Sequence, residues 1–411
     1  MLNRIIQFAL DQKLFVSLGL LILILSGALA FKNLPVEAFP DVSDIQVNVI
    51  TLYPGRAAEE VEKQVTIPIE IALSGLPNSV RIFSHTQFGL SFLMVTFNDK
   101  TTDFIARQQV AERLRSVDLP PGIQPEIAPL STAIGEIYRF RLKGIGKDTQ
   151  ELRTLQDWVV EKQLRQVPGV ADVVVIGGQV KQYEVNPNLA KMRDYKVSLG
   201  ELFEALSRGN ANAGGGRVEE GRQQYLLRSL GLFKSSAEIG SVVVAENRGV
   251  PILVKDIAEI RTTYAPPQGL MAQDEEDDIV VGTVLMRKGE NPSLVLEGIK
   301  QRVEKLNDEI LPKGVTIEPY YDRSWLIDKT LRTVFGNLVE GAILVVLVLY
   351  LFLVNARAAA IVAMTIPLAL LSTFIGLTIV GIPANLLSLG AMDFGIIVDG
   401  AVIVVENIFR H

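Results

Sequence analysis

The sequence predicts an α+β membrane protein, in which a transmembrane helix bundle carries an external region of two ferredoxin-like β-α-β-β-α-β units with a subdomain inserted into the second. Three observations predict this fold class. Long apolar runs lie near the two ends of the 411-residue chain. Residues 33–335, between these runs, have an ordinary globular composition. In that region, strand and helix patterns follow an order that occurs twice.

Four apolar runs can cross a bilayer as helices, since only a helix satisfies its own backbone polar groups in lipid. The first continues into KNLPVEAFPD rather than into a small-residue cleavage site, so we interpret it as an anchor and not as a cleaved signal peptide. Pro367 in the third run is tolerated in a membrane helix. The runs are residues 14–31, 337–354, 358–382 and 386–409.

Positive residues beside the runs predict their orientation. Arg4 and Lys13 precede the first run, Arg357 lies between the second and third, and Arg410 follows the fourth. The GIPAN connection between the third and fourth runs carries no charge. We therefore expect both ends of the chain to face the cytoplasm and residues 33–335 to lie outside.

The first ferredoxin-like unit is expected in residues 33–132. Alternating apolar and polar residues indicate strands, and apolar residues three or four apart indicate helices. A turn at Gly89 joins the two central strands, and a Thr or Asp caps the second helix. In chain order we expect a strand at 45–55, a helix at 56–76, two strands within 80–99, a helix at 101–119 and a closing strand at 123–130.

The same order begins again at residue 133 but is interrupted. Its first half, 133–186, holds a strand at 136–142, a helix at 152–167 and strands within 171–185. Its second half, 269–335, holds a strand at 278–288, a helix at 292–311 and a strand at 315–324. Residues 187–268 form an inserted subdomain, with a helix at 198–210, a glycine-rich turn at 212–217 and strands at 223–231 and 240–247.

Composition excludes several classes of site. The absence of cysteine excludes disulfides and thiolate metal sites, and a net charge of -6 without a basic run argues against a nucleic-acid partner. The stretch KGIGKDT has Asp148 where a nucleotide-binding loop needs a hydroxyl. With His85 and His411 as the chain's histidines and no HExxH motif, a catalytic metal site is not expected. We therefore expect neither enzyme activity nor a cofactor.

Two groups of residues could meet metal ions, but a structural role is favoured for both. The acidic residues of QDEEDD could attract divalent cations, whereas a solvated loop before a strand is the favoured interpretation. Methionines could pass Cu(I) or Ag(I) along a pathway, although gap-filling in apolar patterns is their usual role. The acidic residues are Asp274, Glu275, Glu276, Asp277 and Asp278, and the methionines are Met94, Met271, Met286, Met364 and Met392.

Three carboxylates in the fourth run are different: Asp393, Asp399 and Glu406. An aspartate at the centre of a membrane helix costs roughly 2.5 to 3.5 kcal/mol, and such residues usually serve protons or ions inside a bundle. On a helix Asp399 and Glu406 point in nearly the same direction about 10 Å apart, whereas Asp393 is turned by about 120°. The three trace a path rather than a chelating cluster. This favours a proton relay, with hydrogen bonds between helices as the alternative, which suits Glu406 best because it can reach the interface.

Several motifs together resemble the heavy-metal efflux branch of the resistance-nodulation-division (RND) transporters. They are NLPVEAFPDVSDIQVNVITLYPGRAAEEVEKQVTIPIE, TLQDW, YYDRSWLID and GAMDFGIIVDGAVIVVENIFRH, and the similarity covers the whole chain in order. The resemblance implies a proton/substrate antiporter in the inner membrane of a Gram-negative bacterium. It also implies a homotrimer that works with a periplasmic adaptor protein and an outer-membrane channel.

The resemblance divides the chain and assigns roles to its carboxylates. Residues 1–32 and 336–411 would hold the transmembrane helices, 33–132 the first porter subdomain, 133–186 and 269–335 the second, and 187–268 a docking subdomain. Asp399 matches the central proton-relay aspartate of the family, Asp393 matches an additional acid of the divalent-cation branch, and Glu406 belongs to the same motif.

Family members are about twice as long as this chain, so we expect it to be a partial sequence. The lysine expected to pair with Asp399 and the principal metal ligands would then lie in the absent half. The acid pair of DFGIIVD favours export of zinc, cobalt, cadmium or nickel over copper or silver. The rival interpretations are an RND pump for organic compounds, and a non-transporting membrane scaffold or protein-export accessory.

Overall fold

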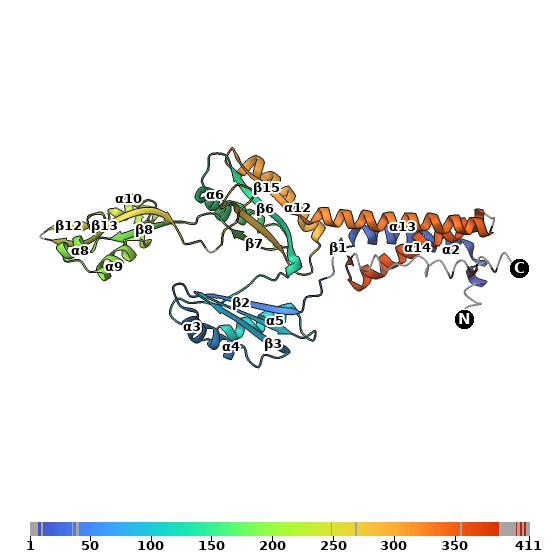
Figure 1. Cartoon of the computed structure of the whole chain (residues 1–411), viewed down its shortest axis with the longest axis horizontal. Coiled ribbons are helices and arrows are strands. Elements are labelled where there is room, and N and C mark those ends of the chain that lie inside the picture. Colours follow the sequence, from blue (N-terminus) through green and yellow to red (C-terminus); the bar gives the residue numbers. More distant parts are fainter. Residues whose placement is uncertain are drawn as a thin grey trace.

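The computed structural model describes residues 7–9, 11–34, 36–37, 41–247, 249–267, 269–353 and 356–385, together with residues 400, 403, 404 and 407. The molecule is elongated, with long helices at one end and an extended subdomain at the other (Figure 1). We name its four parts the helix bundle (α2, α13 and α14), module 1 (residues 45–127), module 2 (136–176 with 280–322) and the insertion (181–264).

Module 1 is a four-stranded antiparallel sheet covered by helices. Its strands lie in the order β3-β4-β2-β5, which is the order of a ferredoxin-like sheet. The strands are β2 (Ile45–Leu52), β3 (Ser79–Gln87), β4 (Leu90–Phe97) and β5 (Glu126–Ile127). The helices are α3 (Ala58–Val61), η1 (Glu62–Thr66), α4 (Ile67–Leu73) and α5 (Asp103–Leu114).

Local chemistry explains these elements. In β4, Leu93, Val95 and Phe97 alternate into the core with more exposed neighbours, as a half-buried strand requires. Gly89 has φ +69° in the turn that joins β3 to β4. The Thr102 hydroxyl accepts a hydrogen bond from the backbone N–H of Ile105 and so caps α5.

Module 2 repeats this arrangement, with the strand order β15-β6-β14-β7. Its central strand β6 therefore pairs with the last strand of the module, and the insertion leaves the chain between β7 and β14. The strands are β6 (Glu136–Gly144), β7 (Val170–Ile176), β14 (Val280–Met286) and β15 (Val315–Asp322). The helices are α6 (Thr149–Leu155), η3 (Gln156–Val160), α7 (Glu161–Leu164), α12 (Pro292–Lys305) and η4 (Leu306–Ile310).

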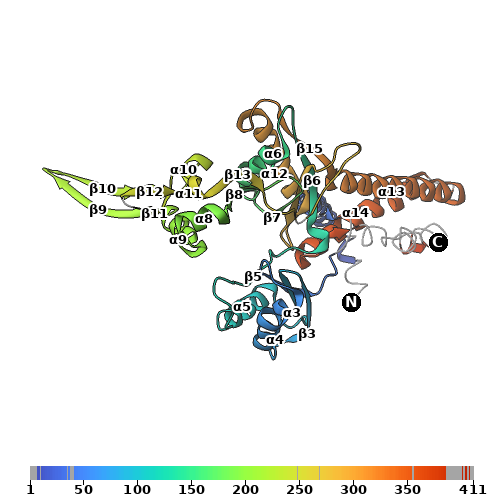
Figure 2. The same ribbon diagram turned by 60° about the vertical axis from the view of Figure 1, so that its left-hand side comes forward.

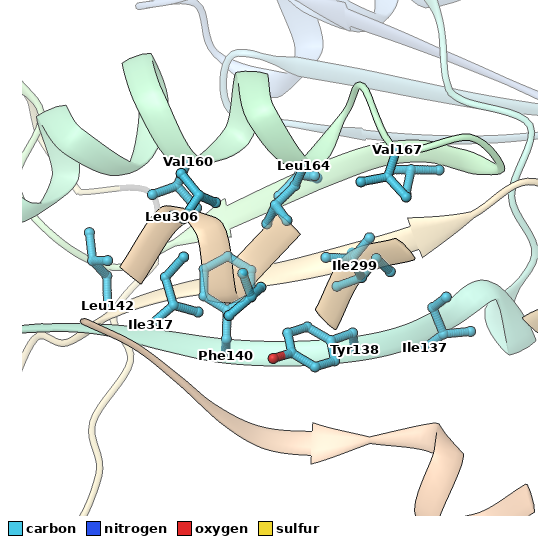
Figure 3. Close-up of a cluster of buried hydrophobic side chains, with 14 of the residues drawn as sticks. Ile137, Tyr138, Phe140, Leu142, Val160, Leu164, Val167, Ile299, Leu306 and Ile317 are labelled. Atoms are coloured by element: carbon cyan, nitrogen blue, oxygen red, sulfur yellow. The ribbon is translucent and has the colours of Figure 1, made fainter. Parts of the chain in front are cut away.

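The core of module 2 lies between its helices and its sheet (Figure 3). Phe140 and Tyr138 on β6 point from the sheet toward Leu306 and Ile299 of the covering helix. A Cβ atom on Gly282 of the neighbouring strand would lie 2.3 Å from the Phe140 ring. Glycine is therefore required at this position in β14.

Three helical turns, η1, η3 and η4, are π-helical. Each continues an α-helix in one of the modules, so the two modules share this irregularity. A π turn adds one residue to the local period, which a pattern of 3.6 residues does not reveal. The predicted helices at 56–76, 152–167 and 292–311 are present, but each includes such a turn.

The insertion is entered through β8 (Lys181–Pro187) and left through β13 (Ala258–Tyr264), which pair antiparallel. A separate core contains Met192, Leu202, Val254 and Ile257. The remaining helices are α8 (Leu189–Tyr195), α9 (Leu199–Gly209), α10 (Ser236–Gly240) and α11 (Val254–Ile257), and the remaining strands are β9 (Ala213–Glu220), β10 (Gln223–Ser229), β11 (Val243–Asn247) and β12 (Val250–Leu253).

The predicted glycine-rich turn at 212–217 is wrong. Residues 213–217 begin β9, which pairs with β10 in the exposed hairpin at the far end of the molecule (Figure 2). A Cβ atom on Gly215 would lie 2.9 Å from Cβ of Leu227, and Gly216 has φ +81° beside a bulge at Leu227/Arg228. The glycines therefore permit a close and irregular strand pairing rather than a reversal of the chain.

The helix bundle contains α2 (Lys13–Asn33), α13 (Arg323–Leu353) and α14 (Ala356–Val380). Among the described residues, two helical segments are long and apolar enough to cross a membrane, Lys13–Lys32 and Ala359–Val380. The segment Val339–Val348 of α13 is a shorter apolar stretch. This helix begins at Arg323, well before the predicted start near residue 337, and at about 1.5 Å per residue its 31 residues extend far beyond that stretch.

Candidate functional site

The predicted proton-relay residues Asp393, Asp399 and Glu406 lie outside the described residues. The structure describes the helices that contain the other three apolar runs. The contacts between these helices, and the charged residues where the helices meet the modules, make up the described part of the candidate site.

Helices α2 and α14 approach each other closely at Gly27. A Cβ atom there would lie 2.6 Å from Cβ of Leu371, so only glycine allows this approach. One turn further along, the rings of Phe31 and Phe374 lie 5.1 Å apart. Small residues at such contacts are the usual means by which helices associate in lipid, where there is no hydrophobic drive between them.

The helix ends next to the modules are joined by backbone pairing. After α2, β1 (Val36–Glu37) pairs in parallel with β16 (Ala384–Asn385), which follows α14. Helix α13 starts at the same end, directly after β15 (Figure 1). The exits of α2 and α14 and the start of α13 therefore lie on one side, as the expected external position of residues 33–335 requires.

The acidic run at 273–278 forms a loop whose charges have structural partners. Glu276 accepts a hydrogen bond of 2.6 Å from Nη2 of Arg141, a side chain that is 10% exposed. Asp278 accepts a hydrogen bond of 2.8 Å from the backbone N–H of Gly178. Within the described part of the chain, no group of three or more His, Asp or Glu residues is placed to hold a metal ion. The run lies in a loop before β14, and a role in binding metal stays a prediction.

A charged junction that the sequence analysis did not find lies where the helices meet the modules. Its cavity of about 20 Å³ is lined by Glu37, Asp41, Thr132, Lys288 and Arg323, among others. This space is sufficient for one water molecule. The Thr132 hydroxyl donates a hydrogen bond of 2.9 Å to Asp41.

Arg323, the first residue of α13, is buried in this junction. Its Nη1 donates a hydrogen bond to the carbonyl oxygen of Ile134, whereas its Nε has no protein partner. A buried guanidinium without a full set of acceptors is costly.

The two carboxylates of the junction have opposite pKa shifts. Burial and the charge of Asp41 raise the pKa of Glu37, against the opposing charge of Arg323. Burial also acts to raise the pKa of Asp41, but hydrogen bonds from Ser43 and Thr132 and the charge of Lys288 together lower it. The junction therefore favours a negative Asp41 and disfavours a negative Glu37.

The parts of this junction are far apart in the sequence, and each is an ordinary polar residue beside an element boundary. Glu37 and Asp41 lie in the NLPVEAFPD motif and Arg323 lies in YYDRSWLID, but neither motif indicates that these residues meet each other or Lys288. The junction forms because the sheet of module 2 brings the end of β14 beside the start of α13. The contact between these residues could therefore not be predicted without knowing the order of the strands.

These features define a class of protein: a membrane protein with two ferredoxin-like modules mounted on a helix bundle. A model of the AcrB/AcrD/AcrF family matches residues 5–411. The chain belongs to this family, the RND transporters, and resembles the N-terminal part of the members of its heavy-metal efflux branch.

The chain is similar to several curated proteins and solved structures. Protein HelA of Legionella pneumophila is 41% identical over 420 residues. The cobalt-zinc-cadmium resistance protein CzcA of Cupriavidus metallidurans is 41% identical over 422 residues. In both cases the match covers 100% of this chain and 40% of the relative. A crystal structure of a heavy metal efflux pump superposes with a TM-score of 0.93 at 44% identity, covering 99% of this chain and 41% of that chain.

Proposed function

We propose that this chain is the N-terminal portion of a proton-driven RND pump that exports divalent heavy-metal cations. The observation that carries the proposal is the set of three carboxylates, Asp393, Asp399 and Glu406, within one apolar run of a chain that belongs to this family. Protons entering from outside would bind Asp399 and leave toward the cytoplasm. Binding and release would shift the fourth helix and so alternate access in the external modules.

The divalent metals are favoured by the acid pair of MDFGIIVD and by the names of similar proteins. CzcA is named for cobalt, zinc and cadmium, and the nickel-cobalt-cadmium resistance protein NccA of Alcaligenes xylosoxydans xylosoxydans is 38% identical over 420 residues. The acidic loop at 273–278 remains a weak metal candidate, because its Glu276 and Asp278 already have partners.

The remaining assignments follow from the family. We propose an inner-membrane homotrimer in a Gram-negative cell, with module 1 and module 2 as porter subdomains and the insertion as a docking subdomain. A periplasmic adaptor protein and an outer-membrane channel would complete the path to the outside. The pump carries its cargo without an enzymatic step.

The substitution Asp399→Asn in the full-length protein tests the proposal. We expect metal resistance of a sensitive host to be lost, because asparagine cannot bind and release the proton that drives transport. Growth in graded zinc, cobalt, cadmium and nickel measures the effect. Immunoblotting and native gel electrophoresis check that expression and trimerisation persist.

Asp99→Asn, in an exposed loop of module 1, is the matched control and should keep full resistance. Full resistance of the Asp399→Asn protein would refute the proposed proton relay. Resistance to organic compounds, without resistance to any of the four metals, would instead favour the organic-compound pump.

A further inference from the structure

Module 2 and the helix bundle are packed against each other and are expected to move as one body. Ile327, in the second turn of α13, belongs to the hydrophobic core of module 2. Val36, after α2, packs against the same core. Leu331, one turn further along α13, also packs against this core. A movement of α2 or α13 must therefore be shared by module 2, because packed cores do not deform continuously.

Module 1 is attached in a different way. Its hydrophobic core is a separate cluster, and among the described elements all extensive packing of a helix or strand of module 1 is within module 1 itself. Two chain segments, 41–44 and 128–135, connect it to the rest (Figures 1 and 2). A polar cleft of about 410 Å³ lies beside these segments. Domains joined by so little apolar contact move relative to each other by default.

One side chain, that of Lys288, connects module 1 to module 2. Among the described residues, the hydrogen bonds and ion pairs that join residues 41–130 to residues 136–322 all involve Lys288. Its Nζ lies 3.5 Å from Oδ1 of Asp103 and donates a hydrogen bond of 3.4 Å to the carbonyl oxygen of Ser43. Its backbone N–H donates a hydrogen bond of 3.2 Å to the carbonyl oxygen of Leu130.

The position of Lys288 suits it for this role. It lies two residues after the end of β14, in the turn that follows this strand of module 2. Its side chain is 19% exposed and that of Asp103 is 26% exposed, which places the ion pair in a partly desolvated gap where screening is reduced. Asp103 is the first residue of α5, the helix that packs on β2 of module 1.

We propose that the contacts of the Lys288 side chain with Asp103 and Ser43 hold module 1 in place on module 2. When these contacts are lost, module 1 turns about segments 41–44 and 128–135. A pair of this kind is weak enough to break and re-form, so it sets the populations of a docked and a released position. The proposal concerns the chain itself and does not depend on the proposed transport activity.

Spin labels test this contact directly, because residues 1–411 contain no cysteine that would compete with two introduced ones. We choose Glu112→Cys on α5 and Glu304→Cys on α12, both exposed. Double electron–electron resonance on labelled protein, diluted with unlabelled protein in nanodiscs, measures the distance between the modules within one chain. We expect one narrow distance distribution with Lys288 intact, and a shift of part of the population to a second distance in Lys288→Met.

Asp103→Asn should produce the same shift, which keeps the test valid if Lys288→Met fails to fold. Lys288→Arg should restore the single distribution, since it retains the charge. Lys300→Met is the matched control, because it removes a Lys–Asp pair of 2.7 Å that lies within module 2 at Asp322. Distributions for Lys288→Met and Asp103→Asn that equal that of the parent protein would overturn the proposal, as would an equal shift in Lys300→Met.

Discussion

Individual residues in module 2 are fixed by close backbone approaches and by burial. A Cβ atom on Gly177, which has φ +78°, would lie 2.0 Å from the carbonyl oxygen of Ile279, so this position accepts glycine alone. Tyr138 is 2% exposed and its ring packs beside Phe140, with the centroids 6.1 Å apart. Close packing of this kind limits which residues the sheet accepts, and the same burial shifts the pKa of Tyr138.

Tyr138 makes the stability of module 2 depend on alkaline pH. Burial, with a further contribution from Asp322, raises its pKa from 10.0 to about 12. The unfolded chain releases the proton near the lower value and the folded chain near the higher one. The stabilisation is therefore complete below pH 10 and is lost as the pH rises through 12, by at most about 2.7 kcal/mol for a shift of two units.

Urea unfolding at stepped pH, followed by the fluorescence of Trp158 and Trp325, measures this effect. We expect the free energy of unfolding to fall between pH 10 and 12 in the parent protein, by more than in Tyr138→Phe. Tyr225→Phe, at a 49% exposed position in the insertion, should retain the parent's decline. Identical pH profiles for the parent and Tyr138→Phe would contradict the prediction.

At the scale of elements, the helices of the bundle combine two kinds of packing. Helix α13 enters the core of module 2 through Ile327 and then continues into the apolar segment Val339–Val348. Helices α2 and α14 instead contact each other through Gly27 and Leu371. The first contact is driven by burial from water, whereas the second depends on shape, because lipid is as apolar as the side chains.

Gly27→Val should separate α2 from α14. The added side chain has no space beside Leu371, and overpacking of this kind typically costs about 1 to 3 kcal/mol. We expect a lower midpoint of thermal unfolding in detergent micelles, followed by circular dichroism. Gly19→Val, on the same helix but with no atom within 4 Å of the added Cβ, is the matched control. An equal midpoint for both variants would show that the close approach does not stabilise the bundle.

In the whole molecule, the insertion has a hydrophobic core separate from that of module 2 and is joined to it by a hydrogen bond of 3.0 Å from Nε2 of Gln150 to the carbonyl oxygen of Thr263. It has its own core, and no residue of 181–264 belongs to the described core of module 2. The chain enters and leaves at adjacent points, because the backbone N–H of Ala265 donates a hydrogen bond of 2.8 Å to the carbonyl oxygen of Val180. The four-stranded sheet of module 2 is complete without it.

Replacing residues 181–264 by Asn-Gly should therefore leave module 2 folded. Two residues are enough to close an antiparallel pair, and Asn-Gly favours the required turn. We expect the unfolding midpoint reported by Trp158 to remain close to that of the parent protein. As a control, removing 170–264 deletes β7 from the sheet and should unfold the module. Loss of the Trp158 transition after the shorter deletion would show that the insertion supports module 2.

The periodic parts of the protein could be predicted from local patterns of residues. Alternation in β4 and the cap at Thr102 are local, so strands and helices of both modules could be assigned, and their repeated order predicted ferredoxin-like sheets. The apolar runs at 14–31 and 358–382 likewise predicted α2 and α14. The relay of Asp393, Asp399 and Glu406 stays a prediction, since these residues lie outside the described part.

Which distant residues meet depends on how the sheets and helices are arranged in the folded chain. The π turns and the strand at 213–220 depend on packing and pairing that no local period records. The same holds for Lys288, which lies 185 positions from Asp103, and for Arg323, which lies 189 from Ile134. Contacts over such separations are set by sheet order and by the cost of burying charge without a partner, and both act on the folded chain as a whole.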